Sequence, residues 1–167
     1  RLRGRHHRAG ATMAWKIARL NRDDTLGIET VSRWSFDAWG GLHPHTTFEE
    51  WRDETRSDCG AKGVPSVFVA MSDGKPVATA SLTVSDMSIR PAMGPWLASV
   101  FVLPAWRGRG IASALGATVE AEAREAGFRR LHLYTPDQMA LYARLGWVPS
   151  ESLTYRGERV TLMHRNL

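Results

Sequence analysis

Residues 96–112 read WLASVFVLPAWRGRGIA, and this stretch decides the fold. The apolar run Trp96–Leu103 predicts a strand that ends at Pro104. A turn with glycine at positions 108 and 110 follows, and a helical period of apolar residues begins directly after it. The first amides of a helix lack intrahelical acceptors, and the helix dipole makes that end partly positive. The turn therefore predicts a site for a pyrophosphate.

Three phosphate-binding patterns compete for this turn. The ATP and GTP loop ends in Gly-Lys-Ser/Thr, and Arg107–Ala112 contains no lysine, which argues against nucleoside triphosphates. The dinucleotide fingerprint Gly-x-Gly-x-x-Gly/Ala is met only in part, because Ser113 stands at its last position and no βαβ unit opens the chain. The third pattern, Gln/Arg-x-x-Gly-x-Gly/Ala, is met by Arg107, Gly110 and Ala112.

A second segment downstream reads LHLYTPDQMALYARLGW at residues 131–147. It predicts a strand over 129–135 and a short helix over 136–145, with Pro136 in its first turn and Gly146 as its terminator. The long helix before it, from Gly110 to Ala126, carries one apolar stripe and ends at Gly127.

In this order and spacing, the two segments resemble the signature motifs of the GNAT superfamily of acyl-coenzyme-A N-acyltransferases. The resemblance covers about a third of the chain strongly, from Pro95 to Trp147. It implies an α/β GNAT fold, with a central mixed, mostly antiparallel sheet of about seven strands, splayed in the middle and flanked by about four helices. It also implies an N-acetyltransferase in which a primary amine directly attacks acetyl-coenzyme A, with no metal.

The resemblance assigns the cofactor contacts to the first segment and the general acid to the second. In relatives, the splayed strand pairs with the pantetheine arm, and the amides of the turn take the pyrophosphate. The matching positions are Val100, Phe101, Val102, Arg107, Gly108, Arg109, Gly110, Ile111, Ala112 and Ser113. Tyr142 matches the tyrosine that protonates the leaving thiolate, and an amide near Val102 is expected to stabilise the oxyanion. An asparagine that relatives carry after the next strand is missing, or its contact passes to Gln138.

The sequence offers several candidates for the general base and for the residues of the acceptor pocket. Asp86, Trp96 and Tyr134 are the candidates for contact with the acceptor, although Trp96 stands where some relatives carry a glutamate and cannot accept a proton. His43 and His45 can bind or deprotonate an amine, but they are more typical of ordinary loop histidines. Cys59 is interpreted as helix packing, because nothing around it in the sequence provides a base for a ping-pong nucleophile.

Local signals place the remaining elements. We expect strands over 15–20, 66–71, 76–85, 147–155 and 158–165, with an Asp73–Gly74 hairpin turn. Asp23 or Asp24 caps a helix that runs to Trp39, and Thr47 with Glu50 has the spacing of a capping box for a helix to Cys59. The acceptor pocket is expected to draw on these two helices and on the Asp86–Pro95 loop, in a tryptophan-rich part of the chain.

The chain of 167 residues suits one domain, which we place at residues 13–167. Four of its five net positive charges come from arginines in residues 1–12, which predicts a basic tail of upstream or expression origin rather than a nucleic-acid-binding arm. A single cysteine and the lack of a long apolar run favour a cytoplasmic protein without a membrane partner.

The sequence does not determine the chemical class of the acceptor. It is also compatible with either a monomer or a homodimer. A small-molecule amine and a protein N-terminus or lysine are both compatible with the motifs. A long groove would favour protein, whereas a closed pocket lined with carboxylates would favour a polycation. A non-catalytic acyl-coenzyme-A-binding module is the alternative to an enzyme.

Overall fold

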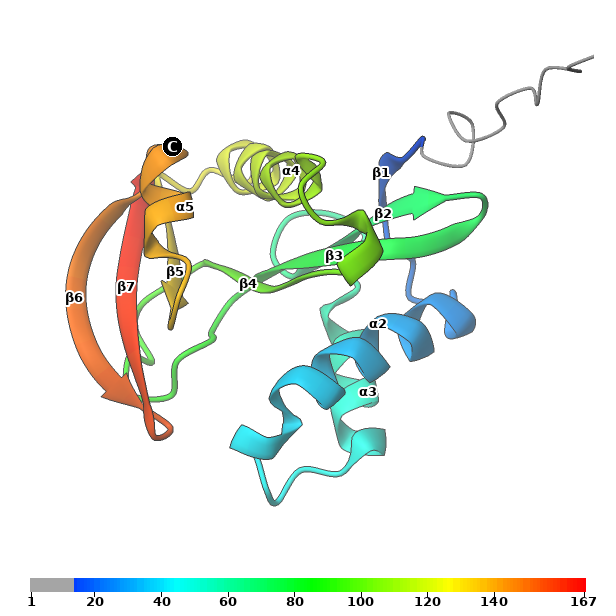
Figure 1. The fold of residues 1–167 in the computed structure, drawn as a ribbon, viewed down its shortest axis with the longest axis horizontal. Coiled ribbons are helices and arrows are strands. Elements are labelled where there is room, and N and C mark those ends of the chain that lie inside the picture. Colours follow the sequence, from blue (N-terminus) through cyan, green and yellow to red (C-terminus); the bar gives the residue numbers. More distant parts are fainter. Residues whose placement is uncertain (1–13) are drawn as a thin grey trace, which may run out of the picture.

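A seven-stranded sheet runs through the computed structural model, which describes residues 14–167 (Figure 1). The predicted basic tail, residues 1–12, lies outside the described residues. The strand order is β1-β2-β3-β4-β5-β7-β6, and every neighbouring pair is antiparallel except β4–β5. The strands are β1 (Lys16–Arg19), β2 (Ser66–Ser72), β3 (Lys75–Thr83), β4 (Trp96–Val102), β5 (Arg130–Thr135), β6 (Val148–Tyr155) and β7 (Glu158–Asn166).

Helices cover both faces of the sheet, as the GNAT resemblance predicts. They are α2 (Thr25–Trp39), α3 (Phe48–Asp58), α4 (Ile111–Glu125) and α5 (Met139–Arg144), with short 3₁₀ turns η1 (Gly40–Leu42) and η2 (Pro104–Trp106). Within residues 14–167 no helix is long and apolar enough to cross a membrane. The expected α/β class, strand number and helix number are confirmed.

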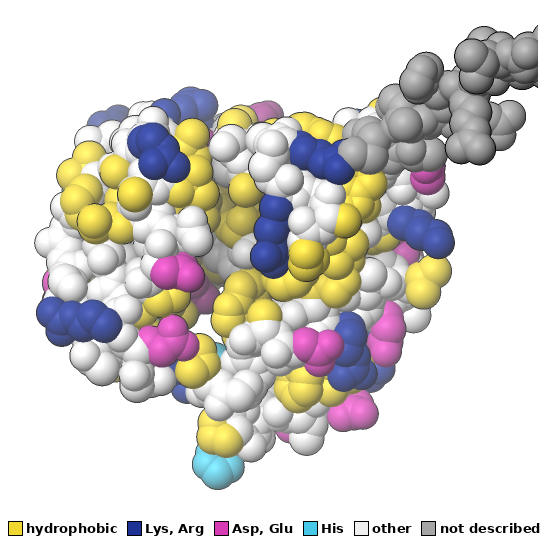
Figure 2. Space-filling view, viewed as in Figure 1, with side chains coloured by type: hydrophobic (Ala, Val, Ile, Leu, Met, Phe, Trp, Pro, Cys, Tyr) yellow, Lys and Arg dark blue, Asp and Glu magenta, His cyan; other side chains and the backbone are white. Residues whose placement is uncertain are grey.

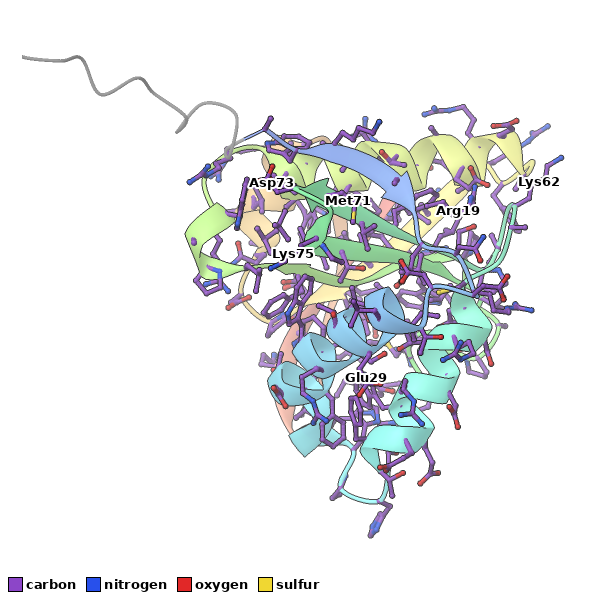
Figure 3. The ribbon with its side chains drawn as sticks, turned by 90° about the vertical axis from the view of Figure 1, so that its right-hand side faces the viewer. Arg19, Glu29, Lys62, Met71, Asp73 and Lys75 are labelled. Atoms are coloured by element: carbon purple, nitrogen blue, oxygen red, sulfur yellow. The ribbon has the colours of Figure 1, made fainter. Side chains whose placement is uncertain are left out.

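The two faces of β3 differ in chemistry, and this difference places the site. Ala78, Ala80 and Leu82 are buried in the core that includes the apolar stripe of α4. The alternate residues of the strand are hydroxylic and point to the opposite face, toward α2 and α3; they are Thr79, Ser81 and Thr83. Figure 3 views the sheet from its β1 edge, with α4 on one side and α2 and α3 on the other.

Local capping explains where the helices begin. Asp24 caps α2 by accepting from the Gly27 amide at 2.8 Å, and Thr47 and Glu50 form the predicted capping box of α3. The short helix α5 begins at Met139 rather than at Pro136, so that prediction is wrong. The Thr135 hydroxyl accepts from the Gln138 amide at 2.9 Å, and this bond holds the intervening residues in a turn.

A polar contact ties the β1 edge to α4. Arg19 donates to Glu122 at 2.7 Å, and the same carboxylate oxygen accepts from the Gly63 amide at 2.7 Å. Figure 3 labels Arg19 at this edge, between the sheet and α4. Glu122, which stands at the margin of the apolar helix stripe, thus serves a structural role.

The sheet splays between β4 and β5. These strands share one register pair, Trp96 with His132, and β4 then diverges from β5 (Figure 1). On its other side β4 continues beside β3 through a bulge, because one β3 residue lies opposite two β4 residues between the pairs Ser81–Ala98 and Thr79–Phe101. Ser99 in this bulge has a φ of 54°, in the left-handed region.

Candidate active site

A cleft of about 810 Å³ lies where β4 and β5 part, and its size is in the usual range of small-molecule sites. The surface is hollowed between the β5–β7 half and the rest of the molecule, with hydrophobic side chains along the hollow (Figure 2). Nine of the ten residues predicted to contact the cofactor line this cleft: Val100, Phe101, Val102, Arg107, Gly108, Gly110, Ile111, Ala112 and Ser113.

The glycine turn presents unpaired amides to the cleft. Gly108 and Gly110 have φ values of 76° and 78°, and Gly110 is the N-cap of α4 without any side-chain cap. Helix geometry therefore leaves the amides of residues 111–113 without intrahelical acceptors. A Cβ at Gly110 would meet no heavy atom within 4 Å. Glycine is thus required by the backbone conformation, and open space lies in front of the turn.

The two arginines of the turn have different roles. Arg107 lines the cleft, and its Nε donates to the Val102 carbonyl at 3.1 Å. Arg109 does not line it; its guanidinium donates to the Ala105 carbonyl at 3.1 Å and lies 4.9 Å from the centre of the Trp106 ring. Arg109 therefore braces η2, and its contact with the cofactor stays a prediction.

The cleft-facing edge of β4 offers backbone groups to a ligand. The Leu103 amide donates to the Val77 carbonyl at 3.0 Å, so Leu103 faces β3. Because neighbouring strand residues alternate in direction, the amide and carbonyl of Val102 point away from β3, toward the cleft. The Phe101 ring stacks on Trp34 with 5.6 Å between ring centres, which anchors this strand to α2.

Tyr142 lies on α5 along the wall of the same cleft. Its ring packs edge-on against Trp147, with 6.1 Å between ring centres. Burial raises the pKa of the Tyr142 hydroxyl, so the group keeps its proton at neutral pH. Gln138, the sequence candidate to replace the missing asparagine contact, also lines the cleft.

A second cavity of about 150 Å³ adjoins the cleft on the α2–α3 side of the sheet. Five residues line both spaces and mark their junction: His43, Trp51, Asp86, Ala98 and Ser99. The two N-terminal helices form much of its wall, as expected, whereas the Asp86–Pro95 loop contributes only Asp86. This is the candidate acceptor pocket.

Three carboxylates line the acceptor pocket, and two of them escaped sequence analysis. Glu54 and Asp58 lie one turn apart on α3, and Asp86 follows β3. Burial, reinforced by Asp58 and Glu54, raises the pKa of Asp86 to about 7. Burial and Glu54 raise the pKa of Asp58 to about 6. The signal that points to them is the stripe of Trp51, Glu54, Thr55 and Asp58, which follows helical spacing on one face of α3.

The other two sequence candidates for the acceptor site, Tyr134 and Trp96, lie in different surroundings. Tyr134 lines the cleft, and burial together with the nearby Asp86 carboxylate raises the pKa of its hydroxyl. Trp96 is 0% exposed, and its Nε1 donates to the Met93 carbonyl at 2.8 Å. Trp96 lines neither cavity, so its assignment to the acceptor is corrected to a core role. Met93 and Tyr134 pack in the same cluster.

The two loop histidines differ in their position relative to the site. His43 lies at the junction of the two spaces, and burial and Arg156 lower its pKa, which leaves the ring neutral at pH 7. His45 lines neither space.

Cys59 is 3% exposed, and burial and Asp58 raise the pKa of its thiol to about 11. A thiol in that state is a poor nucleophile, which agrees with its interpretation as packing. No group of three or more potential ligands in residues 14–167 is arranged to hold a metal ion.

Solved structures share this architecture. An acetyltransferase of the GNAT family from Streptococcus pneumoniae superposes with a TM-score of 0.69 at 20% identity, over 92% of this chain and 99% of that one. An aminoglycoside 6'-acetyltransferase type Ii gives 0.70 at 16% identity, over 90% and 96%. The PaiA N-acetyltransferase from Thermoplasma acidophilum, solved with coenzyme A, gives 0.64 at 16% identity, over 92% and 99%.

Sequence comparison gives the family. N-alpha-acetyltransferase 80 of Mus musculus is 42% identical over 66 residues, which are 38% of this chain and only 21% of that protein. The model of the acetyltransferase (GNAT) family matches residues 28–147, which include the glycine turn, Asp86 and Tyr142. The chain therefore belongs to the GNAT family of acetyltransferases.

Proposed function

We propose that this chain transfers the acetyl group of acetyl-coenzyme A to a primary amine by direct attack, with Tyr142 as the general acid. One observation carries the proposal: the glycine turn, the open edge of β4, Tyr142 and Asp86 all line one cleft. A site for the phosphates, an edge for an extended ligand, a proton donor and a proton acceptor thus share a single space.

The residues present fit acetyl-coenzyme A. The amides of residues 111–113 would hold the pyrophosphate at the uncapped start of α4. The edge of β4 over Val100–Val102 would pair with the amide groups of the pantetheine arm, as an added strand pairs with a sheet edge. When bound, the co-substrate supplies the thioester carbonyl that the amine attacks.

Two titratable groups of the chain then move the protons. An alkyl amine has a pKa of about 10.4, so its neutral form costs roughly 4–5 kcal/mol at pH 7. Asp86, at the junction, accepts the proton that the ammonium loses. The nitrogen forms a bond to the carbonyl carbon, the carbon–sulfur bond breaks, and its electron pair leaves on sulfur. Tyr142 protonates that thiolate, and the acylated nitrogen then releases its second proton, which restores the Tyr142 hydroxyl. The Val102 amide donates to the carbonyl oxygen as negative charge develops.

A protein N-terminus is the second candidate acceptor, because the matching mouse protein is named for that activity. Its match covers about a fifth of the mouse protein, so the acceptor must be argued from this chain's own pocket. That pocket is about 150 Å³ and is lined by three carboxylates, which favours a small cationic amine over a protein N-terminus.

The proposal is tested by thiol release from acetyl-coenzyme A in the presence of a panel of alkylamines, diamines and peptides. We expect acceptor-dependent thiol release and an N-acetylated product by mass spectrometry. Tight binding of coenzyme A without turnover across the whole panel would identify an acyl-coenzyme-A-binding module instead.

A further inference from the structure

We propose that the acceptor carries a second ammonium group, held by Glu54 and Asp58, while the amine to be acetylated lies at Asp86. The acceptor is thus a small aliphatic diamine or polyamine. This inference rests on the proposed N-acetyltransferase function and names the substrate class of the same site.

The first argument is that the pocket holds negative charge without a matching cation. Among the ion pairs described for residues 14–167, none includes Glu54, Asp58 or Asp86. Two arginines lie near the end of α3, but Arg22 donates to the Ser57 carbonyl and Arg56 to the Arg22 carbonyl. Glu54 and Asp58 are four residues apart on one helix, an arrangement that is unfavourable for like charges unless a cation lies between or beside them.

A buried hydroxyl gives independent evidence for a polar ligand in this pocket. Thr83 lines the cavity and is 9% exposed, and its Oγ1 is buried without a hydrogen-bond partner in the part of the chain that the structure describes. A buried hydroxyl that lacks a partner is costly, so such groups usually meet a ligand or an ordered water. Thr79 and Ser81 present two further hydroxyls on the same face of β3, although Thr79 already donates to the Phe68 carbonyl.

The position of Asp86 defines which end of the acceptor reacts. Asp86 lines both the acceptor pocket and the cleft that contains Tyr142, whereas Glu54 and Asp58 line the acceptor pocket alone. An amine at Asp86 therefore faces the acyl group, and a second ammonium at the α3 pair lies away from it. His43 at the junction does not neutralise the carboxylates, because burial and Arg156 keep its ring uncharged.

The dimensions of the pocket favour a short chain. A volume of about 150 Å³ is about that of a cavity that holds one benzene-sized molecule, so the pocket suits a short aliphatic acceptor. The pKa values of Asp58 and Asp86 are both raised, so a cation bound beside these carboxylates would stabilise their ionised forms.

The test compares butylamine with 1,4-diaminobutane, which have the same carbon chain and differ by one ammonium group. We expect kcat/KM for the diamine, measured by thiol release with saturating acetyl-coenzyme A, to exceed that for butylamine about tenfold or more through a lower KM. The double variant Glu54→Gln/Asp58→Asn should remove this advantage, so that kcat/KM for the diamine falls about tenfold more than kcat/KM for butylamine. Asp53→Asn is the matched control, since Asp53 is on the same helix, is 70% exposed and lies outside the pocket.

Calorimetric titration of the complex with coenzyme A separates this inference from the proposed function. Diamine binding that is lost in the double variant supports the pocket assignment even if no amine is turned over, and in that case only the enzymatic proposal fails. Turnover of butylamine and diamine with equal kcat/KM, equal losses for both in the double variant, or turnover confined to peptides would overturn the inference and leave the acetyltransferase proposal intact.

Discussion

Trp96 on β4 pairs with His132 on β5, and no described residue of β4 beyond Trp96 has a register partner on β5. The His132 amide donates to the Pro95 carbonyl at 3.0 Å, so the strands are joined at one end only. Trp96 is fully buried in the cluster of Met87, Tyr155, Val160 and Leu162, which fixes the point of divergence. The remaining edge of β4 is left open, and the cleft of the acetyltransferase forms beside it.

Gly110→Asp should abolish binding of coenzyme A. The φ of 78° is strained for a side chain, and the new carboxylate would point into the space proposed to hold the phosphates. We expect the Kd of coenzyme A, measured by calorimetry, to rise about 100-fold or more, because a phosphate contact becomes a repulsion between like charges.

Gly74→Asp is the matched control for this change. Gly74 has a φ of 74° and an equally open Cβ position, but it lies in the β2–β3 hairpin turn. Both variants should lose similar amounts of thermal stability, and only Gly110→Asp should lose affinity. Unchanged affinity in Gly110→Asp would mean that the phosphate site lies elsewhere.

Tyr142→Phe should lower kcat about 100-fold, which is a usual contribution of one general acid. The affinity for coenzyme A should stay within about twofold, because the ring and its edge-on contact with Trp147 remain. Thiol release under saturating conditions measures the first quantity and calorimetry the second. A wild-type kcat in the variant would exclude Tyr142 as the essential acid.

The elements that sequence predicted well depend on neighbouring residues. The turn around Gly108 and Gly110 and the capping box of Thr47 and Glu50 are set by spacings of two or three positions, and the structure has both. The start of α5 was misplaced because the side chain of Thr135, outside the predicted helix, captures the Gln138 amide. A short-range pattern does not reveal which of two competing acceptors an amide will choose.

The acceptor pocket was harder to predict because it depends on tertiary packing. Glu54 and Asp58 belong to a helix whose exposed face is also acidic, so their charge alone does not distinguish them. What distinguishes them is that α3 turns the stripe containing Trp51 toward the hydroxylic face of β3. Trp96 shows the opposite case, since its place on the cofactor strand predicts a pocket residue, whereas its side chain is fully buried in the core.

Cys59→Ala should retain kcat within about twofold. The thiol donates to the Thr55 carbonyl at 3.3 Å, and its raised pKa, about 11, keeps it protonated at neutral pH. Mass spectrometry of the protein mixed with acetyl-coenzyme A alone should show no acetylated cysteine. An acetyl-enzyme at Cys59, or a large loss of kcat in the variant, would replace direct attack by a two-step mechanism.

Asp86→Asn should make the protein more stable at pH 8 and less active. The pKa of Asp86 is raised from 3.8 to about 7, so the folded state binds a proton that the unfolded chain has lost between these values. The free energy of unfolding therefore falls as pH rises through this window, and the penalty is complete above pH 7. The groups that face the carboxylate include Glu54 and Asp58 from α3, Tyr134 from β5 and the neutral His43. None of them supplies a positive charge to offset its ionisation, and Arg156, which lines the same cleft and acts on His43 and Tyr134, is not among the groups that shift the pKa of Asp86.

Asparagine removes the charge and keeps the shape, so the stability gain should appear only where Asp86 is ionised. Thermal unfolding should show a Tm higher than wild type by at least about 2–4 °C at pH 8, the shift that roughly 1 kcal/mol produces in a protein of this size, and no difference at pH 4. The exposed Asp53→Asn should leave Tm unchanged at both pH values. Because the same charge is proposed to receive the amine proton, kcat/KM for 1,4-diaminobutane should fall as stability rises. A variant that is less stable than wild type at pH 8 would show that a cationic partner already satisfies Asp86, and the pocket would then have no unpaired charge to offer an acceptor.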